Sequence, residues 1–230
     1  MTGAAVLAAQ AALHGGAGRV ILSLLGAHAE NPSAAADIMQ RAFEQLDLSH
    51  LTVVAGCGGG QAIRSVLSDI LRHSARLVLD ADGLNAVADN AEWRTLLCAR
   101  GDAPDRATVI TPHPLEAARL LGCTVQTVQQ DRLLAAQTLS QQLQCTVVLK
   151  GSGSVIASPG EPLCINTSGN GLLAIGGTGD VLAGLTGSRL AQGLTPHRAA
   201  CAATWQHGVI ADHWPSGEAL TASRLAERLR

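Results

Sequence analysis

The chain alternates short runs of aliphatic and β-branched residues with longer segments whose apolar residues recur every three to four positions. The short runs are bounded by turn residues, as buried parallel strands are. The longer segments have the period of amphipathic helices and contain few breakers. This pattern predicts strands over 19–25, 51–55, 76–79, 107–110 and 146–149, and helices over 1–18, 34–46, 61–73, 115–121 and 128–143. Strands that alternate with helices favour βαβ units and a doubly wound α/β sheet.

The C-terminal third departs from this alternation. Two short runs, 154–158 and 163–165, flank a Pro-Gly-Glu-Pro segment and predict a hairpin. Beyond Asp180 the pattern is helical, with a break at 193–196 and a last helix near 221–230. No linker, repeat or low-complexity tract divides the 230 residues, so we expect one domain over 1–230.

Composition and charge exclude several classes of partner. The net charge of −2, the lack of a basic stretch and an aromatic content of 2% disfavour a nucleic-acid partner. Six cysteines without CxxC spacing indicate reduced thiols and disfavour structural zinc. No Lys or Arg precedes Arg19, so the charged start of a signal peptide is missing, and no uncharged apolar run reaches the ~18 residues of a membrane span. We therefore expect a cytoplasmic protein without a membrane partner.

Four loops that follow predicted strands contain the residues most suited to chemistry. Ligands of open α/β sheets bind beyond the carboxyl ends of the strands. The loops 56–60, 80–85, 111–116 and 150–154 all follow a predicted strand directly. We expect them to meet at one edge of the sheet and to form a binding site there.

Several of these loop residues have two interpretations. The glycine run 56–60 lacks GxGxxG spacing, so it is either a tight turn or room for a flat ligand. Asp80 and Asp82 are either a helix cap and a solvated residue or ligand contacts. His113 lies between two prolines that stiffen its backbone. Glu116 either stabilises a helix N-terminus or reaches a metal-bound phosphate.

Lys150 and Asp180 point most directly to phosphate chemistry. Lys150 is the only lysine of the chain and is followed by Gly-Ser-Gly-Ser. A compact ammonium beside such donors suits a polyphosphate, whereas a lysine at a strand end can also simply extend its amine to solvent. Asp180 follows Gly176-Gly177-Thr178-Gly179 and precedes an apolar segment. It is either a helix cap or a base beside an anion-binding turn.

Taken together, six motifs resemble the ADP/ATP-dependent NAD(P)H-hydrate dehydratases of the ribokinase-like superfamily. The resemblance covers essentially the whole chain in order. It implies a three-layer α/β/α fold with a mostly parallel central sheet. The motifs are Gly3-Ala4-Ala5-Val6-Leu7-Ala8, Asp80-Ala81-Asp82-Gly83-Leu84-Asn85, Thr111-Pro112-His113-Pro114, Val148-Leu149-Lys150-Gly151, Asn166-Thr167-Ser168-Gly169-Asn170 and Gly176-Gly177-Thr178-Gly179-Asp180.

The resemblance implies a repair reaction. Members use a nucleotide to phosphorylate the ring hydroxyl of the S form of NADHX or NADPHX, and phosphate then leaves to regenerate NADH or NADPH. The chain is most similar to bacterial-type members, which generally use ADP, so ADP or ATP is the expected co-substrate, with Mg²⁺ and a homo-oligomeric state. The implied site residues are Asp180 as base; Ala4, Gly58, Gly60, His113 and Asp180 for the hydrate; Lys150, Gly151, Ser152, Gly153, Ser154 and Gly179 for the nucleotide; Gly177, Thr178 and Gly179 as anion hole; and Glu116 for Mg²⁺.

The chain also departs from the family pattern. Members have a first strand and a Gly-Ser turn before the Gly-Ala helix, whereas Met1-Thr2-Gly3 begins within that turn, so we expect an N-terminally truncated domain. Cys57-Gly58-Gly59-Gly60 replaces Pro-Gly-Leu-Gly, Leu115 replaces a glycine and Ile175 a small polar residue. Two alternatives stay open: a vitamin or sugar kinase of the same superfamily, and a non-catalytic nucleotide-binding remnant.

Overall fold

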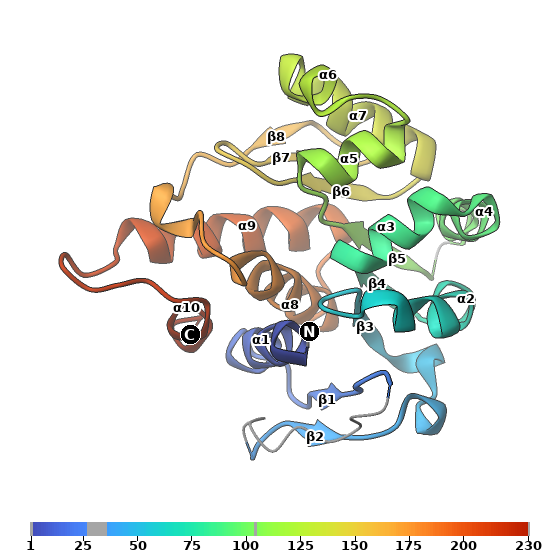
Figure 1. The fold of residues 1–230 in the computed structure, drawn as a ribbon, viewed down its shortest axis with the longest axis horizontal. Helices are drawn as coiled ribbons and strands as arrows, with labels where there is room; N and C mark the ends of the chain where they lie inside the picture. The colour runs from blue at the N-terminus through green and yellow to red at the C-terminus, as the bar shows by residue number, and fades with distance from the viewer. Residues whose placement is uncertain (1, 27–35, 104, 230) are drawn as a thin grey trace.

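A central sheet lies between two layers of helices in the computed structural model, which describes residues 2–26, 36–103 and 105–229 (Figure 1). Six strands lie in the order β3-β4-β5-β6-β7-β8, with β3 to β6 parallel and β6 to β8 antiparallel. This confirms four of the five predicted strands and the predicted hairpin. The strands are β3 (Thr52–Ala55), β4 (Arg76–Leu79), β5 (Ala107–Ile110), β6 (Thr146–Leu149), β7 (Val155–Ala157) and β8 (Cys164–Ile165).

Each face of the sheet has its own hydrophobic core because successive strand residues point to opposite faces. On β4, Leu77 and Leu79 pack into one core and Val78 packs into the other. The first core is covered by α2 (Ile63–His73), α3 (Ala81–Asp89), α4 (Ala91–Ala99), α5 (Pro114–Leu121), α6 (Val125–Gln130) and α7 (Arg132–Leu143). The second is covered by α1 (Thr2–His14), α8 (Thr178–Ala191), α9 (Pro196–Asp212) and α10 (Ala222–Glu227). No helix in these ranges is both long enough and apolar enough to cross a membrane.

The predicted helix over 34–46 is wrong where the structure describes it. Residues 34 and 35 lie outside the described ranges, and the rest forms β2 (Met39–Gln40) and a 3-10 turn, Phe43–Gln45. β2 pairs in parallel with β1 (Ile21–Leu22), which is all that forms of the predicted strand 19–25. Tertiary pairing has therefore overridden a helical spacing of apolar residues.

The predicted helix over 128–143 is two helices, because α6 ends just before Asp131. The Asp131 side chain accepts a hydrogen bond from the Leu134 backbone N–H at 2.9 Å and so caps α7. The buried apolar opening of the chain forms α1, as predicted.

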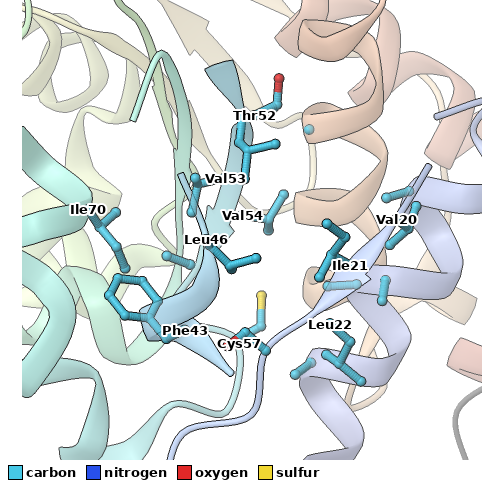
Figure 2. A pocket seen from close by; sticks show the side chains of 18 of the residues that line it. Val20, Ile21, Leu22, Phe43, Leu46, Thr52, Val53, Val54, Cys57 and Ile70 are labelled. Carbon is cyan, nitrogen blue, oxygen red and sulfur yellow. The ribbon is translucent and has the colours of Figure 1, made fainter. Parts of the chain in front are cut away.

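An apolar cavity of about 520 Å³ lies between β1 and β3 (Figure 2). Ile21 and Leu22 line one side and Val53 and Val54 the other. Within the described ranges β3 pairs with β4 alone, so the second edge of β3 faces this cavity. The expectation of a missing first strand stays a prediction.

Helix α8, which presents Asp180, is fixed against α1 by a very close backbone approach. A Cβ on Gly184 would lie 2.0 Å from the Ala8 carbonyl oxygen. At the other end of α8, Ser188 Oγ and Gln192 Nε2 donate hydrogen bonds to the Gly15 carbonyl oxygen at 2.7 and 2.8 Å. Only glycine at position 184 permits this packing.

We expect Gly184→Ala to destabilise the fold by about 1–3 kcal/mol, because the added methyl group must push α1 away from α8. The matched control is Gly3→Ala in α1, where an added Cβ meets no atom within 4 Å. Helix propensity alone should make that variant more stable by up to about 1 kcal/mol. Urea denaturation measures both changes, and equal effects in the two variants would contradict the close-packing argument.

His207 joins α9 to the start of α8 in a buried environment. Its Nε2–H donates to the Thr178 carbonyl oxygen at 3.0 Å, a bond that both the neutral and the protonated ring can make. Burial lowers the pKa of His207 to about 4, although the hydrogen bond to Thr178 works in the opposite direction. The unfolded chain therefore binds a proton at this residue at a higher pH than the folded chain does.

From this difference we expect stability to fall as the pH drops from about 6.5 to about 4, by up to about 1.4 kcal/mol per pH unit. Above this window His207 is neutral in both states and contributes no pH dependence; below it, both states are protonated. The free energy of unfolding measured across the window should vary less in His207→Gln than in the parent chain. The exposed His73→Gln variant is the matched control, and an unchanged slope in His207→Gln would refute the assignment.

Candidate active site

The loops that follow β3, β4, β5 and β6 meet at one edge of the sheet, as the sequence predicts. Parallel register aligns the strand ends: Ala55 is opposite Leu79, and Leu79 is opposite Ile110. Main-chain hydrogen bonds continue beyond the strands, from the Asp80 N–H to the Ala55 carbonyl at 3.0 Å and from the Lys150 N–H to the Pro112 carbonyl at 2.8 Å. The loop residues are therefore held together by the backbone itself.

A buried ion pair joins two of these loops. Lys150 Nζ lies 2.7 Å from Asp80 Oδ1, and the side chains of Lys150 and Asp80 are 18% and 2% exposed. Burial lowers the pKa of Lys150, but the carboxylates of Asp80 and Glu116 outweigh it, so the pKa is raised and the ammonium stays charged. The Asp80 side chain makes no helix-capping hydrogen bond. Asp80 thus occupies the cap position of α3, but its side chain is the partner of Lys150 and does not cap the helix.

The glycine loop 56–60 packs directly on the backbone at Asp80. Gly56 has a φ of 105°, and a Cβ there would lie 1.9 Å from the Asp80 carbonyl oxygen. Gly58 and Gly60 also have positive φ values, 65° and 54°. The Gly60 N–H donates to Asp82 Oδ2 at 2.7 Å, so Asp82 holds the glycine loop. The run is therefore a tight turn that brings bare backbone to the edge of the sheet, and the room it leaves for a flat ligand stays a prediction.

Asp180 lies in the first turn of α8 and faces the same cluster. Gly177, with φ 94°, occupies the cap position of α8, so Asp180 is not the cap. One side-chain oxygen or sulfur atom from each of Cys57, Asp80 and Asp180 lies within 4.8 Å of the others. Burial raises the pKa of the Asp180 carboxyl; Asp80 adds to this, whereas a hydrogen bond with Cys57 and the charge of Lys150 oppose it. A carboxylate with a raised pKa is a stronger base.

The start of α8 also lies beside the ammonium. A Cβ on Gly179 would be 3.4 Å from Lys150 Nζ. The Thr178 hydroxyl lies 2.8 Å from the Leu173 carbonyl oxygen and 3.0 Å from that of Ile175, so its single proton is directed at these oxygens and not at an anion. Asp180 and Lys150 therefore belong to one site, with the glycine backbone of the turn between them.

His113 and Glu116 form a reciprocal cap at the start of α5. His113 Nδ1 accepts from the Glu116 N–H at 3.2 Å, and Glu116 Oε2 accepts from the His113 N–H at 2.8 Å. The other carboxylate oxygen lies 3.2 Å from His113 Nε2. Burial and the charge of Lys150 lower the pKa of His113, and burial raises the pKa of Glu116. The helix-terminus interpretation of Glu116 is thus realised, and its role toward a metal stays a prediction.

Arg132, at the start of α7, fixes the loop 150–154 by hydrogen bonds to main-chain carbonyl oxygens. Arg132 Nη1 donates to the Ser152 carbonyl oxygen at 2.5 Å, and Nη2 donates to the Leu149 carbonyl oxygen at 3.1 Å. A Cβ on Gly151 would lie 2.7 Å from Nη2. Sequence reasoning missed Arg132, because it is one of many scattered arginines and contacts the loop only in the fold.

The other predicted site residues are placed as follows. Gly153 has a positive φ, and the Ser154 hydroxyl donates to the Gly151 carbonyl oxygen at 3.1 Å. Ala4 is buried on α1, in the same core as Cys57. Its role in binding a hydrate stays a prediction.

The residues of the cluster fit a Mg²⁺ ion that arrives with phosphates. Carboxylate oxygens are preferred ligands of Mg²⁺, which usually keeps several waters and takes one or two carboxylates plus phosphate oxygens. Asp80 is bound to Lys150, and both oxygens of Glu116 lie against His113. The Asp180 carboxylate lies in the same cluster, within 4.8 Å of Asp80. Since Asp80 and Glu116 already have partners, a Mg²⁺ ion here would take most of its ligands from phosphate oxygens and water.

Comparison with known proteins agrees with this geometry. A family model described as NAD(P)H-hydrate dehydratase matches residues 1–230. The chain is 41% identical to the ADP-dependent (S)-NAD(P)H-hydrate dehydratase of Neisseria meningitidis serogroup B, over 98% of this chain and 77% of that protein. It is 38% identical to the bifunctional NAD(P)H-hydrate repair enzyme of Escherichia coli, over 91% of this chain and 40% of that enzyme. The chain thus spans less than half the length of this bifunctional relative.

Solved structures show the same relationship in three dimensions. An ADP/ATP-dependent NAD(P)H-hydrate dehydratase from Bacillus subtilis, co-crystallised with ATP and Mg²⁺, matches 100% of this chain and 83% of its own, with a TM-score of 0.79 and 28% identity. A hydroxyethylthiazole kinase from Pyrococcus horikoshii matches 96% of this chain and 92% of its own, with a TM-score of 0.64 and 18% identity, a likeness of fold alone. The fold is therefore ribokinase-like, and the chain belongs to the NAD(P)H-hydrate dehydratase family.

Proposed function

We propose that the chain dehydrates the S form of NADHX or NADPHX to NADH or NADPH, with ADP as the phosphoryl donor. The observation that carries the proposal is the shared site of Asp180 and Lys150, with Gly179 directly beside the ammonium. A base and a cation on either side of a glycine turn suit transfer of a phosphoryl group to a hydroxyl. The relative from Neisseria meningitidis has this activity in its name.

In the proposed mechanism, Asp180 accepts the proton of the ring hydroxyl. The hydroxyl oxygen bonds to the terminal phosphorus of the nucleotide, and the bond from that phosphorus to the bridging oxygen breaks. Phosphate then leaves the ring as the carbon–oxygen bond breaks, the adjacent ring carbon gives up a proton to the departing phosphate or to water, and the carbon–carbon double bond of the reduced nicotinamide is restored. Burial raises the pKa of Asp180, which favours proton uptake at this step.

The nucleotide would be held by Lys150 and by the loop 150–154. Lys150 and the N–H groups at 177–179 would stabilise negative charge on the transferring group. Gly58, Gly60, His113 and Ala4 are the proposed contacts of the hydrate. When bound, Mg²⁺ would neutralise phosphate charge; Glu116 stays its proposed ligand from this chain.

An absorbance assay with NADHX and either ADP or ATP tests the proposal. A dehydratase restores the absorbance of the reduced nicotinamide and releases inorganic phosphate. A vitamin or sugar kinase would instead phosphorylate a stable alcohol and stop. Nucleotide binding without turnover would favour the non-catalytic remnant and refute the proposal.

We further propose that the protein is a cytoplasmic homo-oligomer. All six cysteines are free thiols, which suits a reducing compartment. Size-exclusion chromatography with light scattering distinguishes an oligomer from a monomer.

The first prediction from this mechanism concerns the base. Asp180→Asn should lower the rate of repair by about 100-fold to 10,000-fold, because the amide cannot accept the hydroxyl proton. Nucleotide affinity, measured by calorimetry, should change little because the backbone turn survives. Asp69→Asn on the exposed surface is the control, and undiminished turnover in Asp180→Asn would remove the residue from the mechanism.

The second prediction concerns the cation. Lys150→Ala leaves Asp80 buried without its partner, so we expect it to destabilise the fold by about 3–5 kcal/mol. The double variant Lys150→Met/Asp80→Asn removes both charges and should retain the fold. Its nucleotide affinity should fall by about 10-fold to 100-fold, since a hydrogen bond from a charged group contributes about 1.5–3 kcal/mol. Full nucleotide affinity in a folded double variant would place Lys150 outside the nucleotide site.

A further inference from the structure

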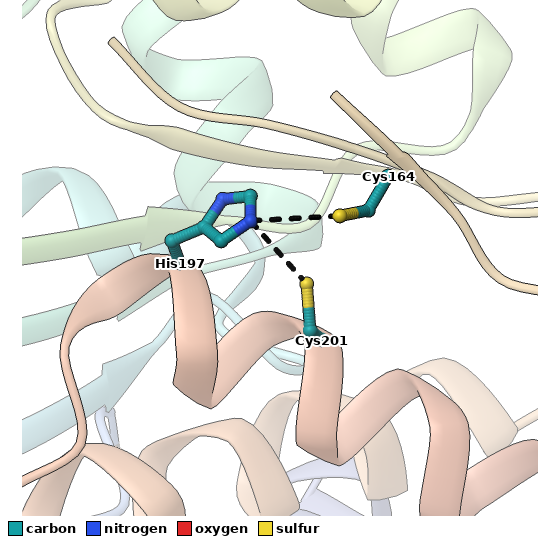
Figure 3. Close-up of side chains that lie close together, drawn as sticks. All are labelled: Cys164, His197 and Cys201. Carbon is teal, nitrogen blue, oxygen red and sulfur yellow. Dashed lines mark hydrogen bonds between the residues drawn. The ribbon is translucent and has the colours of Figure 1, made fainter. Parts of the chain in front are cut away.

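We propose that Cys164, His197 and Cys201 form a zinc-binding site, separate from the candidate active site. His197 and Cys201 lie one turn apart on α9, and Cys164 begins β8 (Figure 3). The cluster lies near Thr146, at the end of β6 opposite Lys150. None of its three residues has a part in the proposed dehydration.

The distances between the three side chains match those of a tetrahedral zinc site. His197 Nε2 lies 3.6 Å from Cys164 Sγ and 3.7 Å from Cys201 Sγ, and all three ligand atoms lie within 4.8 Å of one another. With Zn–N and Zn–S bonds of about 2.0 and 2.3 Å, tetrahedral geometry places the nitrogen and each sulfur about 3.5 Å apart. One ion could therefore contact all three atoms with little rearrangement.

Both sulfurs face the same nitrogen of His197 (Figure 3). A neutral imidazole has one acceptor nitrogen, so without an ion it takes one thiol proton, and the Cys164 thiol has a second acceptor in the Pro162 carbonyl oxygen at 3.8 Å. A cation between the three atoms would instead bind the ring and both thiolates together.

The second ring nitrogen of His197 makes a hydrogen bond, as the non-ligating nitrogen of metal-bound histidines usually does. His197 Nδ1 lies 2.8 Å from Ser158 Oγ, which in turn lies 2.8 Å from Thr146 Oγ1. A hydrogen bond at this nitrogen fixes the ring orientation and directs Nε2 toward the metal. Thr146, Ser158 and His197 come from β6, the end of β7 and α9, so the support is built by the fold.

The cluster also has room for a fourth ligand. Cys164, His197 and Cys201 are only partly buried. A cavity of about 240 Å³ next to the cluster is lined by His197, Ser158 and Glu161. Water can therefore reach the ion, as in zinc sites with three protein ligands. The sequence argument against zinc depended on CxxC spacing, which a site shared by a strand and a helix does not need.

Titration of the reduced protein with Co²⁺ tests the site. One equivalent should produce thiolate-to-cobalt charge-transfer absorption and the visible bands of a tetrahedral ion, and Zn²⁺ should displace both. Cys164→Ser and Cys201→Ser should lose the charge-transfer intensity in part and the double variant completely. Cys123→Ser, which changes a partly exposed thiol elsewhere, should behave as the parent does.

A second measurement separates a metal site from a chance cluster. Ser158→Ala leaves all three ligands in place and should weaken Zn²⁺ binding by about 10-fold to 100-fold. Zn²⁺ should raise the melting temperature of the parent chain but not that of the Cys164→Ser/Cys201→Ser variant. Absence of the cobalt bands in fully reduced protein, or their persistence in that double variant, would overturn the proposal. A Cys164–Cys201 disulfide that forms in glutathione buffer in the presence of Zn²⁺ would overturn it as well.

Discussion

The candidate site depends on a positive charge that is buried against a carboxylate. An ammonium as enclosed as that of Lys150 must have a partner, and Asp80, at 2.7 Å, supplies it. Asp80 is itself fixed because the backbone of Gly56 presses on its carbonyl group, an approach that a side chain at position 56 would prevent. Direct contacts therefore link the glycine loop, the ion pair and the strand ends. A change in any one of them shifts the other two.

The second half of the site is positioned by helix packing. Asp180 reaches the cluster because α8 starts at a left-handed glycine and lies against α1 at Gly184. His207 holds the same helix start from the side of α9. The cation is therefore placed by the sheet, and the base by the helical layer. The distance between the cation and the base depends on how the sheet packs against the helical layer. The site residues are therefore scattered along the chain, because they come from both layers.

Sequence patterns predicted the parts of the fold that local periodicity determines. The strands over 51–55, 76–79, 107–110 and 146–149 were predicted correctly, and so was the convergence of their loops. The prediction of a helix over 34–46 was wrong, because part of that segment pairs with β1 as a strand. The local spacing of apolar residues contains no information about that pairing. Contacts between residues that are far apart in the sequence could not be predicted either. Arg132 could not be connected with the loop 150–154 before the fold brought them together.

The free edge of β3 has a consequence for handling the protein. Unpaired main-chain amides and carbonyls at a sheet edge can recruit an extended polypeptide, and an apolar hollow beside them adds a driving force. Within the described ranges β3 has such an edge, facing Ile21 and Leu22 across the cavity. Elevated concentration or mild heating should therefore promote aggregation that starts at this edge, and purification at low concentration should reduce it.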